Sequence, residues 1–175
     1  MSTSSPLGLS FGLNLPTLRL SLPYITASLG VLALLGGAMN FTNPIEGAKM
    51  FGITLSADSK PTSSPTATET AYIRIHGIRN IAAGLTNIAL CAFYRFSTMT
   101  RTSPIAAEVV RTCIGISLLV GSGVAVGDGF VLNQFARDVE GTDMGEVGNY
   151  AQEKGSGHVL TGVPIAVLGL GWLLL

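Results

Sequence analysis

The chain has 175 residues, of which 47% are hydrophobic and only 11% are charged, and its formal net charge is zero. Soluble domains carry about 25% charged residues, so this composition favours a single integral membrane domain. No basic tract is present, which argues against nucleic acid as a partner.

The N-terminal part of the chain leads into the first apolar helix. Residues 1–17 lack the basic start and continuous apolar run of a signal peptide, and we expect a flexible or interfacial segment. Residues 18–39 are expected to span the membrane, since about 20 apolar residues cross the hydrocarbon core. Pro23 falls near the expected start of this helix, where a missing N–H does least harm. A short helix is predicted from Pro44 to Phe51, before an exposed Ser-, Thr- and Pro-rich loop over 56–70.

The stretch around which the chain is organised is residues 72–94. It is long enough to cross a bilayer as a helix, yet it carries several polar side chains. His76, Asn80 and Asn87 follow the spacing of one helix face, and Arg79 lies beside them on the same turn. A polar stripe inside a membrane segment is costly, and it is normally kept for function or for packing against a partner.

The second half of the chain predicts two more spanning helices. Residues 104–128 form the third, with a proline in the favoured first position, and a short polar turn makes it antiparallel to the second. Residues 129–157 are charged and are expected to be a polar connection outside the bilayer. Residues 158–175 form the fourth helix. The prediction is an all-α fold, an up-down bundle of four transmembrane helices over residues 18–175.

The topology brings unusual side chains together. In such a bundle, the end of the first helix, the start of the second, the end of the third and the start of the fourth share one membrane side. These ends are expected to form a pocket with apolar walls and a few convergent polar groups. Two long loops, over 56–70 and 129–157, are expected to cover it. The candidate residues are Asn40, His76, Arg79, Asn80, Asp128, His158 and Thr161.

Each candidate has a structural alternative. Arg79 is expected either to serve the site or to hold the bundle together by pairing with Asp128 or Glu69. Asp128 lies at an expected helix C-terminus, where a carboxylate opposes the helix dipole, so a cationic partner or a working role is expected.

The histidines and asparagines also have both a functional and a structural interpretation. His76 and His158 are expected either to act in catalysis or to be hydrogen-bonded helix-end residues. Asn80 and Asn87 either line the site or bond neighbouring helices, and for Asn87 interhelical bonding is favoured. The histidines lack metal-ligand spacing, so neither a metal nor another cofactor is expected.

Three features of the sequence resemble a known family. They are NPIEGAKMFGI over Asn43–Ile53, AYIRIHGIRNIAAGL over Ala71–Leu85, and His158 ahead of an apolar helix. Together they are similar to small four-helix membrane proteins, common in fungi, that are classed as a domain of unknown function. The likeness runs over most of the chain from Leu18 onward.

The resemblance implies an activity. Some similar proteins accompany fungal polyketide pathways of the citreoviridin and aurovertin type, where they act as hydrolases that open epoxides during cyclic-ether formation. It therefore implies an epoxide hydrolase or cyclase of secondary metabolism, in the endoplasmic reticulum or another endomembrane. The motif match carries over Arg79 and Asn80, together with Asp128 and His158.

Epoxide opening needs an acid near the ring oxygen and a base for the incoming oxygen. Our hypothesis assigns Asp128 as the base, positioned by Arg79, with His158 or His76 as the proton donor. The lipophilic substrate would be bound by Asn80, Asn40, Asn87 and Thr161.

The competing hypothesis is a non-catalytic membrane scaffold or binding protein whose polar stripe pairs with a partner. A pocket would favour the enzyme, and direct pairing of Arg79 with Asp128 without a pocket would favour the scaffold. The glycine-rich third helix suits a homodimer and packing within one chain equally well.

Overall fold

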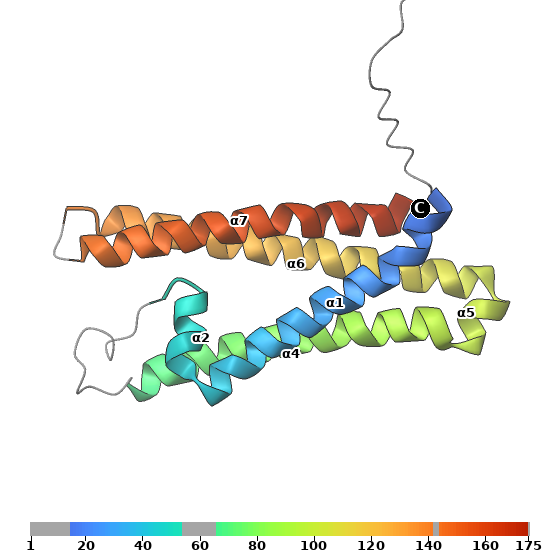
Figure 1. Ribbon diagram of the computed structural model, residues 1–175, viewed down its shortest axis with the longest axis horizontal. Helices are drawn as coiled ribbons and strands as arrows, with labels where there is room; N and C mark the ends of the chain where they lie inside the picture. Colours follow the sequence, from blue (N-terminus) through green and yellow to red (C-terminus); the bar gives the residue numbers. More distant parts are fainter. Residues whose placement is uncertain (1–14, 54–65, 142–143, 175) are drawn as a thin grey trace, which may run out of the picture.

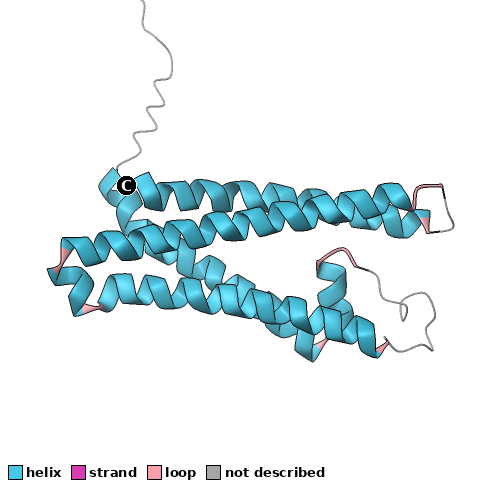
Figure 2. Ribbon diagram, turned by 180° about the vertical axis from the view of Figure 1, so that it is seen from behind, coloured by secondary structure: helices cyan, strands magenta, loops and turns pink. Residues whose placement is uncertain are grey.

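The computed structural model describes residues 15–53, 66–141 and 144–174, and this part of the chain is helical without strands (Figures 1 and 2). The all-α prediction is confirmed. The described residues form six helices, four of them long, where the sequence predicts four spanning helices and one short helix. The helices are α1 (Leu15–Thr42), α2 (Pro44–Met50), α4 (Ala67–Phe96), α5 (Thr98–Thr102), α6 (Pro104–Asp138) and α7 (Gly145–Leu174).

Local capping signals fix several helix ends. The side chain of Thr66 accepts from the backbone N–H of Glu69, whose carboxylate accepts from the N–H of Thr66, which completes a capping box at the start of α4. Ser103 caps α6, and Pro104 follows in the first turn as the sequence predicts. The short helix predicted from Pro44 is present as α2. These ends follow from short-range hydrogen bonding alone.

Several predicted helix boundaries are wrong. The region 129–157 is mostly helical rather than a polar connection, because α6 continues to Asp138 and α7 begins at Gly145. Backbone hydrogen bonds hold a helix together whether its side chains are apolar or charged, so the loss of hydropathy did not mark a helix end. In α1, Pro23 is an interior residue rather than an early one, because the helix begins at Leu15.

The structure describes only a part of the expected N-terminal segment and of the first expected loop. Residues 15–17 belong to α1, and the rest of the predicted segment lies outside the described residues. Most of the predicted loop over 56–70 also lies outside them. The second expected loop over the pocket is replaced by the ends of α6 and α7.

Glycines bring α1 and α4 into backbone contact. Gly30 faces Gly84, and Gly37 faces Gly77, so that each pair is seven residues from the next on both helices. A methyl group added to any of these four would lie 2.5–2.9 Å from the carbonyl oxygen of its partner. Small residues at such positions let membrane helices approach closely.

Glycines also bring α6 and α7 into backbone contact, along a longer stretch of the two helices. Gly129 faces Gly155, and Gly115 faces Gly169, with added methyl groups at 2.5–3.0 Å from the opposing carbonyl oxygens. Between them, the Ser122 hydroxyl donates to the carbonyl of Gly162 at 2.8 Å. A seven-residue repeat of small side chains on both helices is the pattern of a closely packed antiparallel pair.

The two pairs, α1 with α4 and α6 with α7, contact each other less extensively than the helices within each pair. All four long helices supply a core at the end of the molecule nearer α5. There the indole N–H of Trp172 donates to the Thr26 hydroxyl at 2.8 Å, and both residues are buried. The core residues are Leu22, Cys91, Ile114, Leu118 and Trp172.

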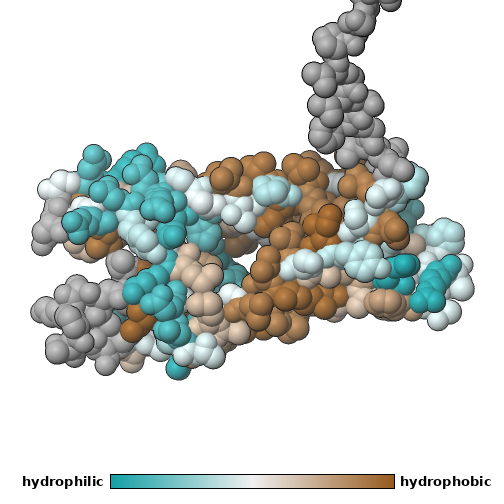
Figure 3. Space-filling model, in the orientation of Figure 1, coloured by the Kyte–Doolittle hydropathy of each residue, from teal (hydrophilic) through white to brown (hydrophobic). Residues whose placement is uncertain are grey.

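The surface of the molecule has an apolar middle and polar ends (Figure 3). Three described helices, α1, α6 and α7, are long and apolar enough to cross a membrane. α4 is not in this group, because its arginines and asparagines lower its mean hydropathy. With 35 residues, α6 is about 50 Å long, well beyond the ~30 Å hydrocarbon core. The crossing predicted for residues 72–94 stays a prediction.

Candidate functional site

The centre of the site is an ion pair between the two helix pairs. Arg79 on α4 donates to both carboxylate oxygens of Asp128 on α6, with Nη2–Oδ2 at 2.7 Å and Nη1–Oδ1 at 3.4 Å. The sequence predicts that Arg79 pairs with Asp128 or with Glu69, and the structure shows the pair with Asp128. Asp128 lies inside α6 rather than at its C-terminus, so the dipole argument made for it does not apply.

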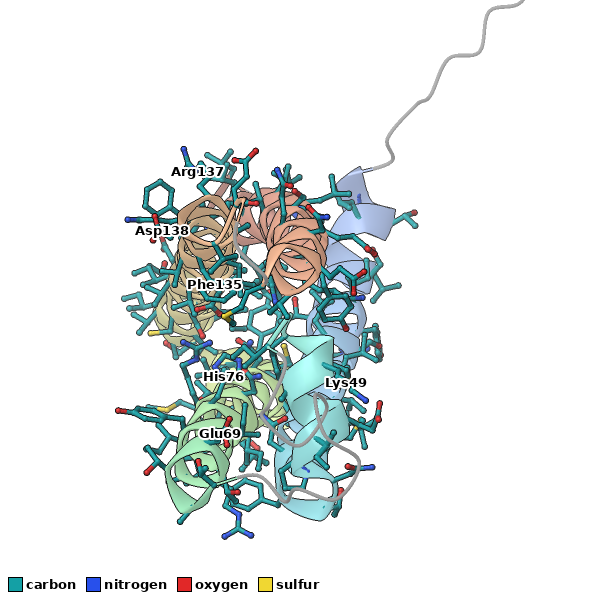
Figure 4. The ribbon with its side chains drawn as sticks, turned by 90° about the vertical axis from the view of Figure 1, so that its left-hand side faces the viewer. Lys49, Glu69, His76, Phe135, Arg137 and Asp138 are labelled. Atoms are coloured by element: carbon teal, nitrogen blue, oxygen red, sulfur yellow. The ribbon has the colours of Figure 1, made fainter. Side chains whose placement is uncertain are left out.

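Both predicted histidines lie near this ion pair and share an aromatic neighbour. His76 is one turn before Arg79, and its Nε2 lies 3.4 Å from the Nη2 of Arg79. The ring of Phe51 meets His76 edge-on at 4.0 Å between centroids, and it lies parallel to His158 at 5.8 Å. Figure 4 shows His76 on the side of α4 that faces α6 and α7. Phe51 therefore links the histidines of two helices.

Phe51 reaches this position through α2. The residue ends α2 and is followed by Gly52, whose φ of +80° favours glycine. Tyr150 on α7 donates its hydroxyl to the carbonyl of Lys49 at 2.7 Å, which ties α2 to the other helix pair. This short helix thus spans the two pairs at the polar end of the molecule.

A pocket of about 470 Å³ lies between all four long helices. Its polar lining includes five of the predicted site residues, and most of the remaining lining is aliphatic. The five are Arg79, Asn80, Asn87, Asp128 and His158. The aliphatic and small residues are Leu29, Ala33, Ala83, Leu118, Val120, Gly121, Val124, Ala125 and Ile165.

The other predicted site residues lie elsewhere. His76 contacts Arg79 and Phe51 without being part of the pocket lining. Thr161 is exposed, and its hydroxyl donates to the carbonyl of Gly157 in the preceding turn at 2.8 Å. Asn40 is fully buried beneath α2, and neither polar atom of its amide has a hydrogen-bond partner in the part of the chain that the structure describes. The structure does not bring Thr161 or Asn40 to the pocket.

Sequence reasoning missed two polar or aromatic residues of the site, Phe51 and Ser117. Ser117 on α6 donates to the Oδ1 of Asn87 on α4 at 3.2 Å, so Asn87 makes the interhelical bond that the sequence favours and also lines the pocket. The serine carries no signal of its own within an apolar helix. For Phe51, the only signal in the sequence was an aromatic residue directly before a glycine, at the end of the predicted short helix.

The arrangement defines a chemical environment. A carboxylate, a guanidinium and an imidazole meet at one end of a largely apolar pocket, so charge and proton acceptance are concentrated there. Such a pocket can hold an oily molecule and present its polar end to an acid–base pair. Three long apolar helices around it fit a membrane protein that associates with the lipid bilayer.

The described part of the chain is all-helical, and its three long apolar helices fit the class of membrane proteins. Within that class, residues 30–173 match the family model of a domain of unknown function, DUF4267, and the chain belongs to this family. No curated protein and no solved structure matches the chain.

Proposed function

We propose that this protein is a membrane-embedded enzyme that opens an epoxide in a lipophilic small molecule by acid–base catalysis, without a cofactor. The observation that carries the proposal is the ion pair of Arg79 and Asp128 beside His158 at one end of a largely apolar pocket. A proton acceptor and a proton donor are the groups that epoxide opening needs. The resemblance to fungal membrane proteins that open epoxides in polyketide pathways points to the same reaction.

In the proposed reaction, the Asp128 carboxylate accepts a proton from water or from a substrate hydroxyl as that oxygen attacks a ring carbon. The ring C–O bond breaks with its electron pair on oxygen, and this oxygen takes a proton from the imidazolium of His158. Attack by water gives a vicinal diol, and attack by the substrate's own hydroxyl gives a cyclic ether. Proton transfer from Asp128 to His158 through water restores both groups.

The contacts of His76 favour His158 as the proton donor. A guanidinium has only N–H donors, so the Nε2 of His76 must accept from Arg79 at their 3.4 Å contact. His76 therefore supports the orientation of Arg79, which in turn positions Asp128. Asn80 lines the pocket beside Arg79 and orients the incoming oxygen.

We further propose that α4 crosses the bilayer together with α1, α6 and α7, in the endoplasmic reticulum or another endomembrane. The ion pair with Asp128 offsets the charge of Arg79, which lowers the penalty for placing α4 among the apolar helices. A lipophilic substrate would partition into the bilayer and enter the pocket from the hydrocarbon.

The test is turnover by purified protein in lipid nanodiscs, supplied with a panel of long-chain epoxides and followed by mass spectrometry of the products. Asp128→Asn is expected to lower turnover at least about 100-fold, since general acid–base catalysis contributes that much. Arg74→Gln, an exposed arginine on the same helix outside the site, is the matched control and should be unaffected. A folded Asp128→Asn variant with undiminished turnover would remove the assignment.

A non-catalytic binding or scaffold protein is the second candidate. The direct Arg79–Asp128 contact suits this candidate as well, because such a pair also joins α4 to α6 structurally, whereas the pocket beside the pair favours the enzyme. Wild-type protein that binds the epoxides and converts none of them would favour this candidate over the enzyme.

A further inference from the structure

The pocket has a second polar position, away from the ion pair. Asn80 and Asn87 both line it from α4, and Ser117 and Asp128 both line it from α6. Asn80 lies beside the acid–base groups, whereas Asn87 lies at the Ser117 end. The polar groups are therefore divided between two places along the length of the helices.

The separation of the two positions follows from helix geometry. Seven residues separate Asn80 from Asn87, which places their amides on one face of α4 about 10 Å apart along its axis. On α6, the eleven residues from Ser117 to Asp128 cover about 16 Å. The pocket is thus elongated, with an apolar stretch between its ends that contains Ala83, Gly121 and Val124.

The amide of Asn87 has hydrogen-bonding capacity left over. Its Oδ1 accepts from the Ser117 hydroxyl, which also fixes the direction of the side chain. Its Nδ2 has no hydrogen-bond partner among the described residues, and it is not enclosed by protein atoms as the amide of Asn40 is. A donor on a residue that lines a largely apolar pocket favours a ligand that supplies an acceptor oxygen, because an unmet polar group in such surroundings is costly.

We infer that the ligand of this pocket is an elongated lipophilic molecule that carries an acceptor oxygen about 10 Å from its reacting end. The Nδ2 of Asn87 donates a hydrogen bond to this oxygen. The inference rests on the proposed function in one respect, namely which end of the ligand reacts. A simple hydrocarbon chain would leave Asn87 without a partner. The pocket is therefore specific for oxygenated chains, such as ketones or ethers, over plain ones.

The test compares the binding of two product-like probes, which cannot react. Both are long-chain terminal vicinal diols, and one carries a ketone roughly 10 Å along its chain, matching the helix spacing. Native mass spectrometry of the wild-type protein should show about tenfold tighter binding of the ketone, the upper range for one hydrogen bond. Equal binding of the two diols, or binding of neither, overturns the inference.

Variants locate the effect. Asn87→Leu should remove the preference for the ketone, while Thr86→Leu, an exposed neighbour outside the lining, should keep it. Gly121→Val places a side chain between the two polar positions, in space that is empty of protein atoms, and should weaken binding of the ketone probe. Gly123→Val, also facing open space but outside the lining, is its control. A preference that persists in Asn87→Leu overturns the inference.

The two proposals fail separately. A protein that shows the ketone preference but converts no epoxide would keep this inference and lose the reaction. A protein that converts epoxides without any preference for the ketone diol would keep the reaction and lose this inference.

Discussion

The imidazole of His158 on α7 lies parallel to the phenyl ring of Phe51, with an interplanar angle of 3° and 5.8 Å between centroids. The same phenyl ring meets His76 edge-on. Aromatic contacts of this kind favour particular ring orientations. One side chain at the end of α2 therefore holds the ring planes of both histidines beside the Arg79–Asp128 pair.

Replacing Phe51 should reduce the rate of the proposed reaction. Phe51→Leu keeps an apolar side chain but loses the ring that orients His158, and an aromatic contact is worth about 1 kcal/mol, or roughly fivefold. We expect kcat to fall by that factor with KM nearly unchanged, measured on the best epoxide of the panel. Phe51→Tyr keeps the ring and should retain the rate. A change in KM alone would show that Phe51 only binds substrate.

The ion pair should make a measurable contribution to stability. Arg79 and Asp128 are partly exposed, with 42% and 28% of their side-chain surface accessible, so we expect a coupling of about 1 kcal/mol in a double-mutant cycle. The cycle uses Arg79→Met and Asp128→Asn, with unfolding followed in detergent. The exchanged double variant, Arg79→Asp with Asp128→Arg, should recover stability without recovering turnover. Zero coupling would contradict a structural contribution.

Asn40 should be replaceable with a gain in stability. Its amide is fully buried without a partner among the described residues, and an unmet buried polar group costs about 1–3 kcal/mol. Asn40→Leu keeps the number of side-chain heavy atoms and the branch at Cγ but has no polar atoms, so the free energy of unfolding should rise by about 1 kcal/mol. Turnover should stay the same, since Asn40 is outside the pocket lining. A loss of turnover at unchanged stability would instead support the substrate-binding role expected from the sequence.

Glycines that look alike in the sequence should respond differently to alanine. A methyl group on Gly84 would lie 2.5 Å from the carbonyl oxygen of Gly30, so Gly84→Ala should force α1 and α4 apart and destabilise the protein by about 1–3 kcal/mol. Gly36 faces open space on α1, and Gly36→Ala should be neutral or stabilising, by up to about 1 kcal/mol. Equal effects in thermal unfolding would refute the close packing of these helices.

Features that depend on short-range interactions were predicted well. The helical class, the start of α6 at Pro104 and the short helix α2 were all predicted. The Arg79–Asp128 contact was also among the predicted pairings, because up-down topology limits which helix ends can meet.

Hydropathy misjudged the length of α6 and α7, and the short helix α5 was not predicted. Hydropathy reports whether side chains suit lipid, while helix length follows from backbone hydrogen bonds and packing. Ala136 on α6 packs against Gly148 on α7, so the contact between these helices extends into the charged region. The charged side chains there do not interrupt either helix.

The sequence by itself determined that this chain is an all-helical protein with apolar helices and a polar stripe on α4, because composition and residue spacing act within single segments. Only the tertiary structure decided that α1 pairs with α4 and α6 with α7, that Asn40 is buried away from the pocket, and that Phe51 joins His76 to His158. These features arise from contacts between distant segments, where the shapes of particular side chains select one arrangement from many that the same hydropathy pattern allows.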